Sequence, residues 1–396
     1  MSSHYLFTFL GRVPLDQNSG GYRKSTYQFP DGLQKTTSFS GIAIEEWQQP
    51  DQVVVLGTTG SMWHVLLELT DTYDQAPELW EDLERSHSND EVTQSQLDAL
   101  SEHLSRARDR RWVARLIPYG RDRKEQAEIL RTLAAEVPQR TQVTLDVTHG
   151  FRHLPMVMLV AALQLKELHE AKITGFYYGA FEMATGGTAP FLELDGLLEA
   201  AEWLQALHTY TKDGDYGAFA DLYRREGVGE STVGRLEQAA FFERTTNPTL
   251  ASKQLSTLHS SSPNLETPIG GLFSKELWRR IQWFRSPSRA ERERSLAHIY
   301  LKRRDYVRAI VFAQEGYISR HLERRGEDLH SYERRDEARN RIKSDNFQKL
   351  RRVRNAVAHG DRPKSPEARK ALESEANLRK YLEEIFAVLL DDQGAW

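Results

Sequence analysis

The first 190 residues alternate between short apolar runs and segments whose apolar residues recur every three or four positions. The apolar runs are predicted strands, at 4–11, 52–60, 111–120, 141–150 and 172–181. The other segments are predicted helices, at 61–70, 95–107, 124–137 and 154–170. Strands that alternate with helices predict a mostly parallel sheet covered on both faces. PFLELDG (190–196) adds a predicted edge strand.

Beyond residue 190 the periodicity is helical. LDGLLEAAEWLQALHTYTK (194–212) is a predicted helix, and SSSPNLETPIGG (260–271) is a turn-rich connector. Three more helices are predicted at 306–325, 336–360 and 365–390. The pattern therefore divides the chain into three parts. These are an α/β domain (1–190), a helical linker region (191–285) and an all-α domain (286–396).

Composition supports a folded protein of 396 residues, with 39% hydrophobic and 10% aromatic residues. The chain has no cysteine, which excludes disulfides, thiolate metal sites and a cysteine nucleophile, and suits a reducing compartment. The start, MSSHYLFTFLG, lacks the features of a signal peptide. The most apolar segment, 155–165, is too short to span a bilayer. A cytoplasmic protein is expected.

The net charge of −4 is unevenly distributed. Residues 286–396 hold 25 basic and 19 acidic side chains, a balance of +6, so the remaining residues carry −10. A basic end on an acidic chain suggests a polyanionic partner. A solvated helical face with ion pairs four residues apart would give the same composition, so charge alone leaves both readings open.

Three polar turns follow predicted strands of the α/β domain, at 10–27, 57–61 and 146–153. In an open parallel sheet, ligands bind beyond the carboxyl ends of the strands. Glycines let the backbone approach a ligand, hydroxyl groups and helix-start N–H groups bind phosphate, and Arg152 adds a guanidinium. Together the turns predict a pocket for a nucleotide-like ligand.

Each feature also has a structural explanation. GTTGS (57–61) is neither a dinucleotide fingerprint nor a Walker motif, and a Gly/Thr turn after a strand is usually only a turn. His149 and His153 could ligate a metal, but no third ligand stands at a persuasive spacing. A structural role is favoured for both histidines, and no metal site is predicted.

LDVTHGFRHLP after a strand, FTFLG at the start and VVVLGTTGSMW at the second strand resemble the CARF (CRISPR-associated Rossmann fold) sensor domains of type III CRISPR systems. The resemblance spans about 1–185. It implies a Rossmann-like domain that dimerises and binds a cyclic oligoadenylate, with cyclic tetraadenylate favoured and hexaadenylate possible. The implied ligand contacts are Gly11, Arg12, Thr58, Thr59, Gly60, Ser61, Thr148, His149, Gly150, Phe151 and Arg152.

RNAVAHG (354–360) raises a second candidate site. On a helix ending at His359, residues Leu350, Val353 and Val357 form the core stripe, while Asn355 and His359 lie on the opposite side. Gly360 is expected to end the helix, with Pro363 after it. The polar set faces solvent, so it could form a cleft only if two copies met across a two-fold axis. A second Arg-x4-His, RGEDLH (325–330), is read as a chance match in a turn.

This pattern resembles the Arg-x4-His signature of HEPN ribonucleases, which Arg354, Asn355 and His359 match. Together with the CARF-like half, it implies a CARF–HEPN endoribonuclease that a cyclic oligoadenylate activates and that cleaves single-stranded RNA without metal. His359 would be the general acid or base, favoured as imidazolium at a helix carboxyl end. Arg354 would clamp the phosphate and Asn355 would orient it or the histidine. Arg351 and Arg352 would hold the RNA backbone.

Two alternatives remain. The chain could be a ligand-sensing regulator that grips nucleic acid without cutting it, with 227–244 as the best candidate recognition segment. The sensor domain could instead degrade its own cyclic ligand, in which case Thr148, His149 and Arg152 would be suspects. Either way, the expected partners are RNA, a cyclic oligoadenylate and a second copy of the chain, with no membrane.

Overall fold

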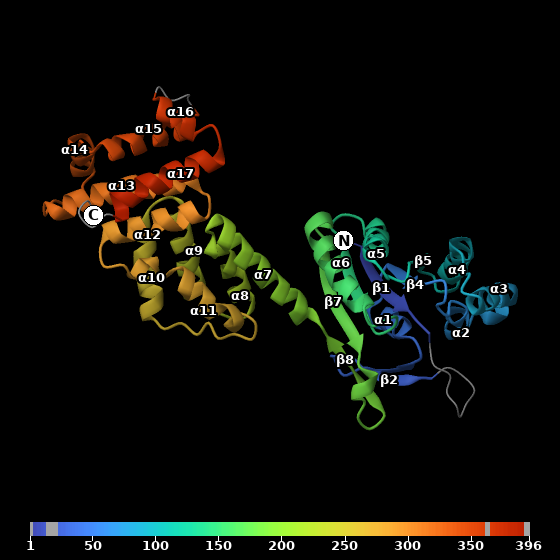
Figure 1. The fold of residues 1–396 in the computed structure, drawn as a ribbon. Helices are drawn as coiled ribbons and strands as arrows, with labels where there is room; N and C mark the ends of the chain where they lie inside the picture. The colour runs from blue at the N-terminus through green and yellow to red at the C-terminus, as the bar shows by residue number, and fades with distance from the viewer. Residues whose placement is uncertain (1–2, 13–22, 361–364, 392–396) are drawn as a thin grey trace. The chain divides into compact units, whose positions relative to one another are not determined.

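A computed structural model describes residues 3–12, 23–360 and 365–391. The chain divides into two compact units, Met1–Leu198 and Glu199–Trp396 (Figure 1). Unit 1 contains every described strand, and unit 2 is helical throughout the residues described there. Among the described residues, no helix is long and apolar enough to cross a membrane.

Unit 1 is built on a mixed sheet whose order is β3-β2-β8-β7-β6-β1-β4-β5. The strands are β1 (His4–Leu10), β2 (Ser25–Gln28), β3 (Gln34–Thr37), β4 (Gln52–Gly57), β5 (Arg111–Leu116), β6 (Gln142–Asp146), β7 (Lys172–Gly179) and β8 (Thr188–Glu193). All neighbouring pairs from β7 to β5 are parallel, whereas β8 runs antiparallel to β7. The prediction of a mostly parallel sheet is confirmed.

The strand predicted at 190–196 forms as β8 (Thr188–Glu193), but its predicted place at the edge of the sheet is wrong. β8 lies inside the sheet, because β2 pairs with its far side and β3 pairs with β2. These two strands have the sequences STYQ and QKTT, which carry little of the apolar alternation that identifies a strand. Part of the segment read as a turn, 10–27, thus belongs to β2.

Helices cover both faces of this sheet. They are α1 (Ser40–Gln48), α2 (Val65–Leu69), α3 (Pro77–Ser88), α4 (Gln94–Ala107), α5 (Arg123–Ala135) and α6 (Leu154–His169). Helices α5 and α6 pack Leu133 and Met158 against Phe7 and Phe9 of β1. Side chains of α1 to α4 pack on the opposite face, where Leu6 points. The helix predicted at 61–70 forms only over the five residues of α2.

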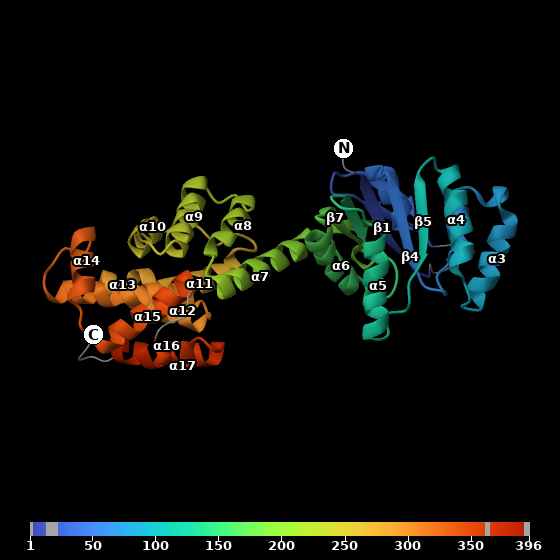
Figure 2. The same ribbon diagram turned by 90° about the horizontal axis from the view of Figure 1, so that it is seen from above.

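Helix α4 also closes one edge of the sheet, beside β5 (Figure 2). Gln94 Oε1, Ser101 Oγ and Ser105 Oγ accept the outward N–H groups of Leu116, Ala114 and Trp112 at 2.9, 2.8 and 2.9 Å. Gln94 Nε2 and Ser105 Oγ donate to the carbonyls of Ala114 and Trp112. Spacings of seven and four place the three side chains on one helix face, so the outer edge of β5 is hydrogen-bonded along its length.

Unit 2 surrounds one continuous core that draws buried side chains from Trp203 to Leu390. Its helices are α7 (Asp195–Asp213, which begins in unit 1), α8 (Ala220–Arg225), α9 (Glu230–Arg244), α10 (Pro248–Ser260), α11 (Gly271–Arg280), α12 (Arg289–Lys302), α13 (Tyr306–Arg324), α14 (Tyr332–Arg341), α15 (Asp345–His359), α16 (Pro366–Ala371) and α17 (Glu375–Phe386). The boundary between a helical linker region (191–285) and a HEPN domain (286–396) stays a prediction.

The predictions of one long helix at 336–360 and another at 365–390 are wrong, because each segment contains parts of two helices. The segment 336–360 contains the end of α14 and all of α15, and 365–390 contains α16 and α17, followed by a π-helical turn. Ser344 caps α15 by accepting from Phe347 N, and Ser374 caps α17 by accepting from Asn377 N at 3.2 Å. A serine that caps a new helix interrupts the old one while the apolar period continues.

Candidate functional site

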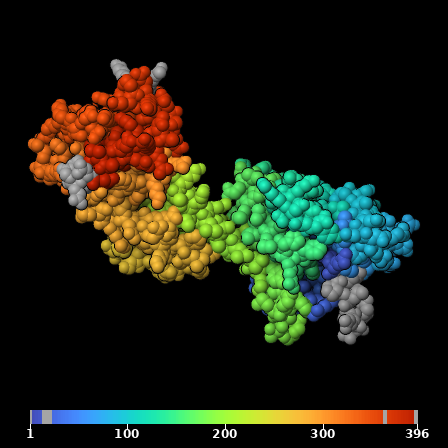
Figure 3. Space-filling view, in the orientation of Figure 1, coloured from blue at the N-terminus to red at the C-terminus, as the bar shows by residue number. Residues whose placement is uncertain are grey.

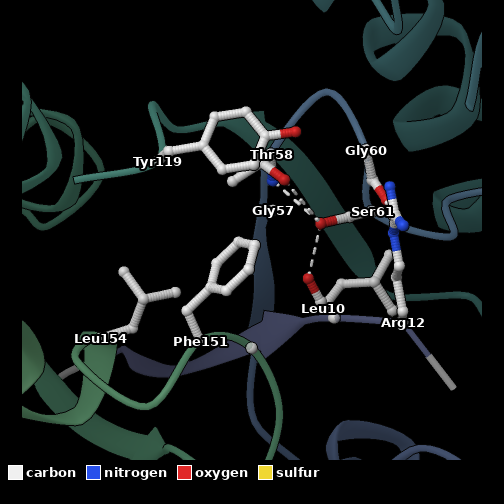
Figure 4. A pocket seen from close by; sticks show the side chains of 11 residues that line it. Leu10, Arg12, Gly57, Thr58, Gly60, Ser61, Tyr119, Phe151 and Leu154 are labelled. Carbon is white, nitrogen blue, oxygen red and sulfur yellow. Dashed lines mark hydrogen bonds between the residues drawn. The ribbon is translucent and has the colours of Figure 1, made fainter. Parts of the chain in front are cut away.

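A pocket of about 370 Å³ lies at the carboxyl ends of β1 and β4, beside the loop that leads into α6 (Figure 4). It brings together seven of the residues proposed from the sequence: Gly11, Arg12, Thr58, Gly60, Ser61, Gly150 and Phe151. Four further residues line it that were not proposed as contacts: Leu10 and Gly57, which begin two of the predicted turns, and Tyr119 and Leu154, which lie outside them. Its place at the strand ends agrees with where open α/β sheets bind ligands.

The turn after β4 is fixed by Ser61. Its hydroxyl donates to Leu10 O at 2.7 Å and accepts from Thr58 N at 2.9 Å, so it joins the ends of β1 and β4. Thr58 and Ser61 are both buried. Trp63 Nε1 donates to Thr58 O at 2.9 Å. This wall of the pocket is therefore rigid. The Ser61 hydroxyl donates its proton to the backbone of the wall and has none left to donate to a ligand.

The turns after β1 and β6 touch through their backbones. A Cβ atom added to Gly11 would lie 2.8 Å from Gly150 N, closer than real Cβ atoms come. Gly150 has φ +92°, a conformation that favours glycine. Gly11 is therefore required by the close approach of the two turns, and Gly150 by its backbone conformation.

Asp146, at the end of β6, organises the third turn. Its carboxylate is fully buried and accepts from Thr8 Oγ1 (2.7 Å) and Ser40 Oγ (2.6 Å). It also accepts from Thr148 N (3.0 Å) and Thr148 Oγ1 (2.6 Å). Thr148 Oγ1 in turn accepts from Gly179 N at 2.8 Å. Four neutral donors thus stabilise a buried carboxylate, and Thr148 faces this network.

The two histidines of this turn have structural partners. His149 Nε2 accepts from Ser40 N at 3.1 Å, and its ring lies 5.5 Å from that of Phe39. Burial lowers the pKa of His149, against the opposing effect of the Asp146 charge. A ring nitrogen that accepts from a backbone N–H is unprotonated, so His149 is neutral here. His153 Nε2 lies 2.8 Å from Tyr119 O and donates to it.

The outer rim of the pocket is aromatic and basic. Phe151 is 47% exposed, and its ring lies 5.6 Å from Tyr119 and 5.9 Å from His153. Arg152 is exposed and does not line the pocket. Thr59 does not line it either, because its hydroxyl donates to Asp90 Oδ1 at 2.9 Å. Exposed aromatic faces of this kind can stack on a base.

Arg12 reaches across the pocket rim, where its Nε donates to Gly60 O at 3.2 Å. The hydroxyl of Tyr119 donates to Asp90, which also accepts from Thr59. These hydrogen bonds lower the pKa of Asp90. Tyr119 lies at the end of the predicted strand 111–120, three residues beyond β5 as it forms (Arg111–Leu116), so the rule about strand ends, applied to that strand too, could have found it.

The second candidate site lies on α15, in unit 2. Leu350 and Val353 are buried and Val357 is partly buried, whereas Arg354, Asn355 and His359 are all exposed. Arg354 Nη1 donates to Asn355 Oδ1 at 3.2 Å.

Gly360 ends α15 with φ +68°, as its sequence position predicted, while Pro363 lies outside the described residues. Arg352 is exposed, and Arg351 Nη1 donates to Gln348 Oε1 at 3.4 Å. The described residues contain no group of three or more His, Asp or Glu side chains placed to hold a metal ion.

Comparison with known proteins gives a family match within unit 1 and one curated relative. Residues 5–182 match the family model of the CARF domain of the CRISPR system endoribonuclease Csx1. A curated relative, CRISPR-associated protein MJ1674 of Methanocaldococcus jannaschii, is 24% identical over 240 residues, which cover 55% of this chain and 37% of the relative. The chain thus spans little more than a third of that relative. The family match includes all three turns of the pocket and ends before α15.

Proposed function

We propose that this chain, a CARF-containing accessory protein of type III CRISPR systems, is an endoribonuclease that a cyclic oligoadenylate activates. The observation that carries the proposal is the shared exposed side of Arg354, Asn355 and His359 on α15, in a chain whose other unit is a CARF domain. The pocket of unit 1 is the proposed sensor site, and α15 is the proposed catalytic element.

The size of the pocket supports a dimeric sensor. About 370 Å³ is near the lower end of the roughly 300–1,000 Å³ typical of ligand pockets, too small for a ring of several nucleotides. A second copy would supply the rest of the site. Helix α6, whose residues fall in the green part of the colour scale of Figure 3, exposes Met156, Val160 and Leu168. A helix that is apolar on all sides is usually buried, so this face is the proposed contact between copies.

The exposed position of the catalytic set supports a second contact, in unit 2. One copy offers Arg354, Asn355 and His359 on an open surface. Two copies of α15 facing each other would form a cleft from both sets. Binding of the ring must favour the arrangement in which the two sets face each other, by on the order of 1–3 kcal/mol for ordinary coupling.

The proposed chemistry needs only the side chains of α15 and the substrate. The RNA 2′-oxygen attacks the adjacent phosphorus, and the bond from phosphorus to the 5′-oxygen breaks. His359 moves protons, taking one from the 2′-hydroxyl or giving one to the leaving 5′-oxygen. Arg354 stabilises the charge on the phosphate, and Asn355 orients it by hydrogen bonding. The products are a 2′,3′-cyclic phosphate and a 5′-hydroxyl, and Arg351 and Arg352 hold the flanking backbone.

The test is cleavage of a fluorogenic single-stranded RNA in EDTA, with and without cyclic tri-, tetra- and hexaadenylate. We expect cleavage with one ring size, cyclic tetraadenylate being favoured. We expect His359→Ala to reduce it by roughly 10²–10⁴-fold, the usual contribution of a general acid or base.

His330→Ala is the matched control, since His330 is the exposed histidine of the other Arg-x4-His segment. Ring binding without RNA cleavage in the wild-type protein would contradict the nuclease and favour a regulator. Equal losses in the two histidine variants would remove His359 from the proposed mechanism.

A further inference from the structure

The side chains of Asp90, Tyr119 and Arg12 converge on the bare face of Gly60, at the rim of the pocket. Figure 4 labels Gly60, Tyr119 and Arg12. A Cβ atom on Gly60 would lie 2.6 Å from Asp90 Oδ1, 2.9 Å from the Tyr119 hydroxyl and 3.0 Å from Arg12 Nη2. Gly60, Tyr119 and Arg12 line the pocket, whereas Asp90 is exposed and does not line it, but accepts a hydrogen bond from Tyr119. A carboxylate is thus held at the edge of a site that we propose for a polyanion.

Asp90 is held there by hydroxyl groups from two other elements. It accepts from Thr59 in the turn after β4 and from Tyr119 after β5. Its own segment lies between α3 and α4, where its backbone has φ +61°. Aspartate tolerates this left-handed conformation better than most residues. The two hydrogen bonds and the nearby Arg12 lower the pKa of Asp90, so it is charged at neutral pH.

The groups around Asp90 are those that a phosphate would use. Hydroxyl groups and a guanidinium donate hydrogen bonds to carboxylate and to phosphate oxygens. A phosphate placed against Arg12 and Tyr119 would meet the Asp90 charge, and two anions at this separation repel each other. A ligand phosphate and the Asp90 carboxylate therefore compete for the hydrogen bonds of the same donors, and binding of one weakens binding of the other.

We propose that Asp90 occupies the position of a ligand phosphate at the rim of the pocket, and that a phosphate of the ligand displaces it from the hydroxyl groups of Tyr119 and Thr59 and takes its place near Arg12. This inference rests on the proposed function, since it takes the cyclic oligoadenylate to be the polyanion. Displacement frees the turn after β4 from the segment between α3 and α4. Asp90 thereby makes binding depend on a ligand with enough negative charge to replace it.

Asp90→Asn tests this, because the amide keeps the size and an acceptor oxygen but loses the charge. We expect the Kd for fluorescently labelled cyclic tetraadenylate to fall about three- to tenfold at low salt, as expected for removing one nearby like charge. The gain should shrink as the salt concentration rises, because salt screens exposed charges. Glu91→Gln is the matched control: it removes the same charge one residue along, from an exposed side chain.

The outcomes separate the inference from the proposed function. Binding by Asp90→Asn that is weaker than wild type, or equal to Glu91→Gln, would overturn the inference and make Asp90 a support for the turn. In that case the proposed function stands, because the wild-type protein still binds the ring. Failure of all three proteins to bind cyclic tri-, tetra- or hexaadenylate would overturn both.

Discussion

Replacing Asp146 by alanine should destabilise unit 1 more than any other single polar substitution near the pocket. The change leaves the donors of Thr8, Ser40 and Thr148 without the carboxylate that now accepts all four of their hydrogen bonds. A buried donor without a partner costs about 1–3 kcal/mol. Hydroxyls can rotate toward other acceptors but the Thr148 N–H cannot, so the expected loss is about 3–5 kcal/mol.

Asp146→Asn should cost less, about 1–2 kcal/mol, because one amide oxygen still accepts and the hydroxyls can turn to accept from the amide nitrogen. The measurement is urea unfolding of the full chain, followed by tryptophan fluorescence and circular dichroism. Only the transition of unit 1 should move, since Asp146 lies in that unit. Labelled-ring binding should weaken as well, because Thr148 and the loop after it lose their anchor.

The control is Asp51→Ala, which removes a carboxylate that accepts one hydrogen bond, from His4 N at 2.7 Å, at an exposed position. It should cost less than about 1 kcal/mol. A loss for Asp146→Ala no larger than that of the control would refute the argument. So would a shift in the transition of unit 2 alone.

Three further outcomes are expected. Gly11→Ala should weaken ring binding at least tenfold by fluorescence anisotropy, because its Cβ would lie 2.8 Å from Gly150 N, whereas Gly196→Ala, with open space around it, should bind as wild type. Burial lowers the pKa of His64 to about 4, so between pH 6.5 and 4 the unfolded chain takes up a proton that the folded chain does not, and stability is lost as the pH falls. That loss should reach up to about 3 kcal/mol at pH 4, and a pH series of urea midpoints in which His64→Phe shows the same slope as wild type would contradict it. Ser101→Val should lower the unfolding free energy of unit 1 by about 1–3 kcal/mol, because it leaves a β5 N–H without its acceptor; an unchanged urea midpoint would show that another group replaces the serine.

Strand β4 was predictable because its apolar run, VVVL, is continuous, as in a strand that is buried on both faces. Strands β2 and β3 were not, because both are four-residue polar strands. β2 depends on pairing with β8, about 160 residues away in sequence, and β3 pairs with β2. The boundary between α14 and α15 was missed because the sequence pattern does not change there. The helical period continues through Ser344, and only its capping hydrogen bond ends one helix and starts the next.

In the pocket too, features with a local sequence signal were predictable and features that depend on distant residues were not. Gly11, Gly60 and Gly150 were predictable because glycine after a strand marks a close backbone approach. The partners that give each side chain its direction were not, since they come from other elements. Thr148 was expected to contact the ligand, yet its hydroxyl bonds Asp146 and accepts from β7. Asp90 has no motif of its own and acquires its place through two distant hydroxyls.

The hydrogen bonds from α4 to the outer edge of β5 also bear on how copies of this chain can associate. A bare strand edge would accept a strand from another molecule, which would leave a new bare edge, so such growth has no natural end. Pairing through helical faces about a two-fold axis stops at two copies. The hydrogen bonds made by Gln94, Ser101 and Ser105 therefore prevent strand addition at this edge of the sheet. Closed dimers formed through helical faces are still possible.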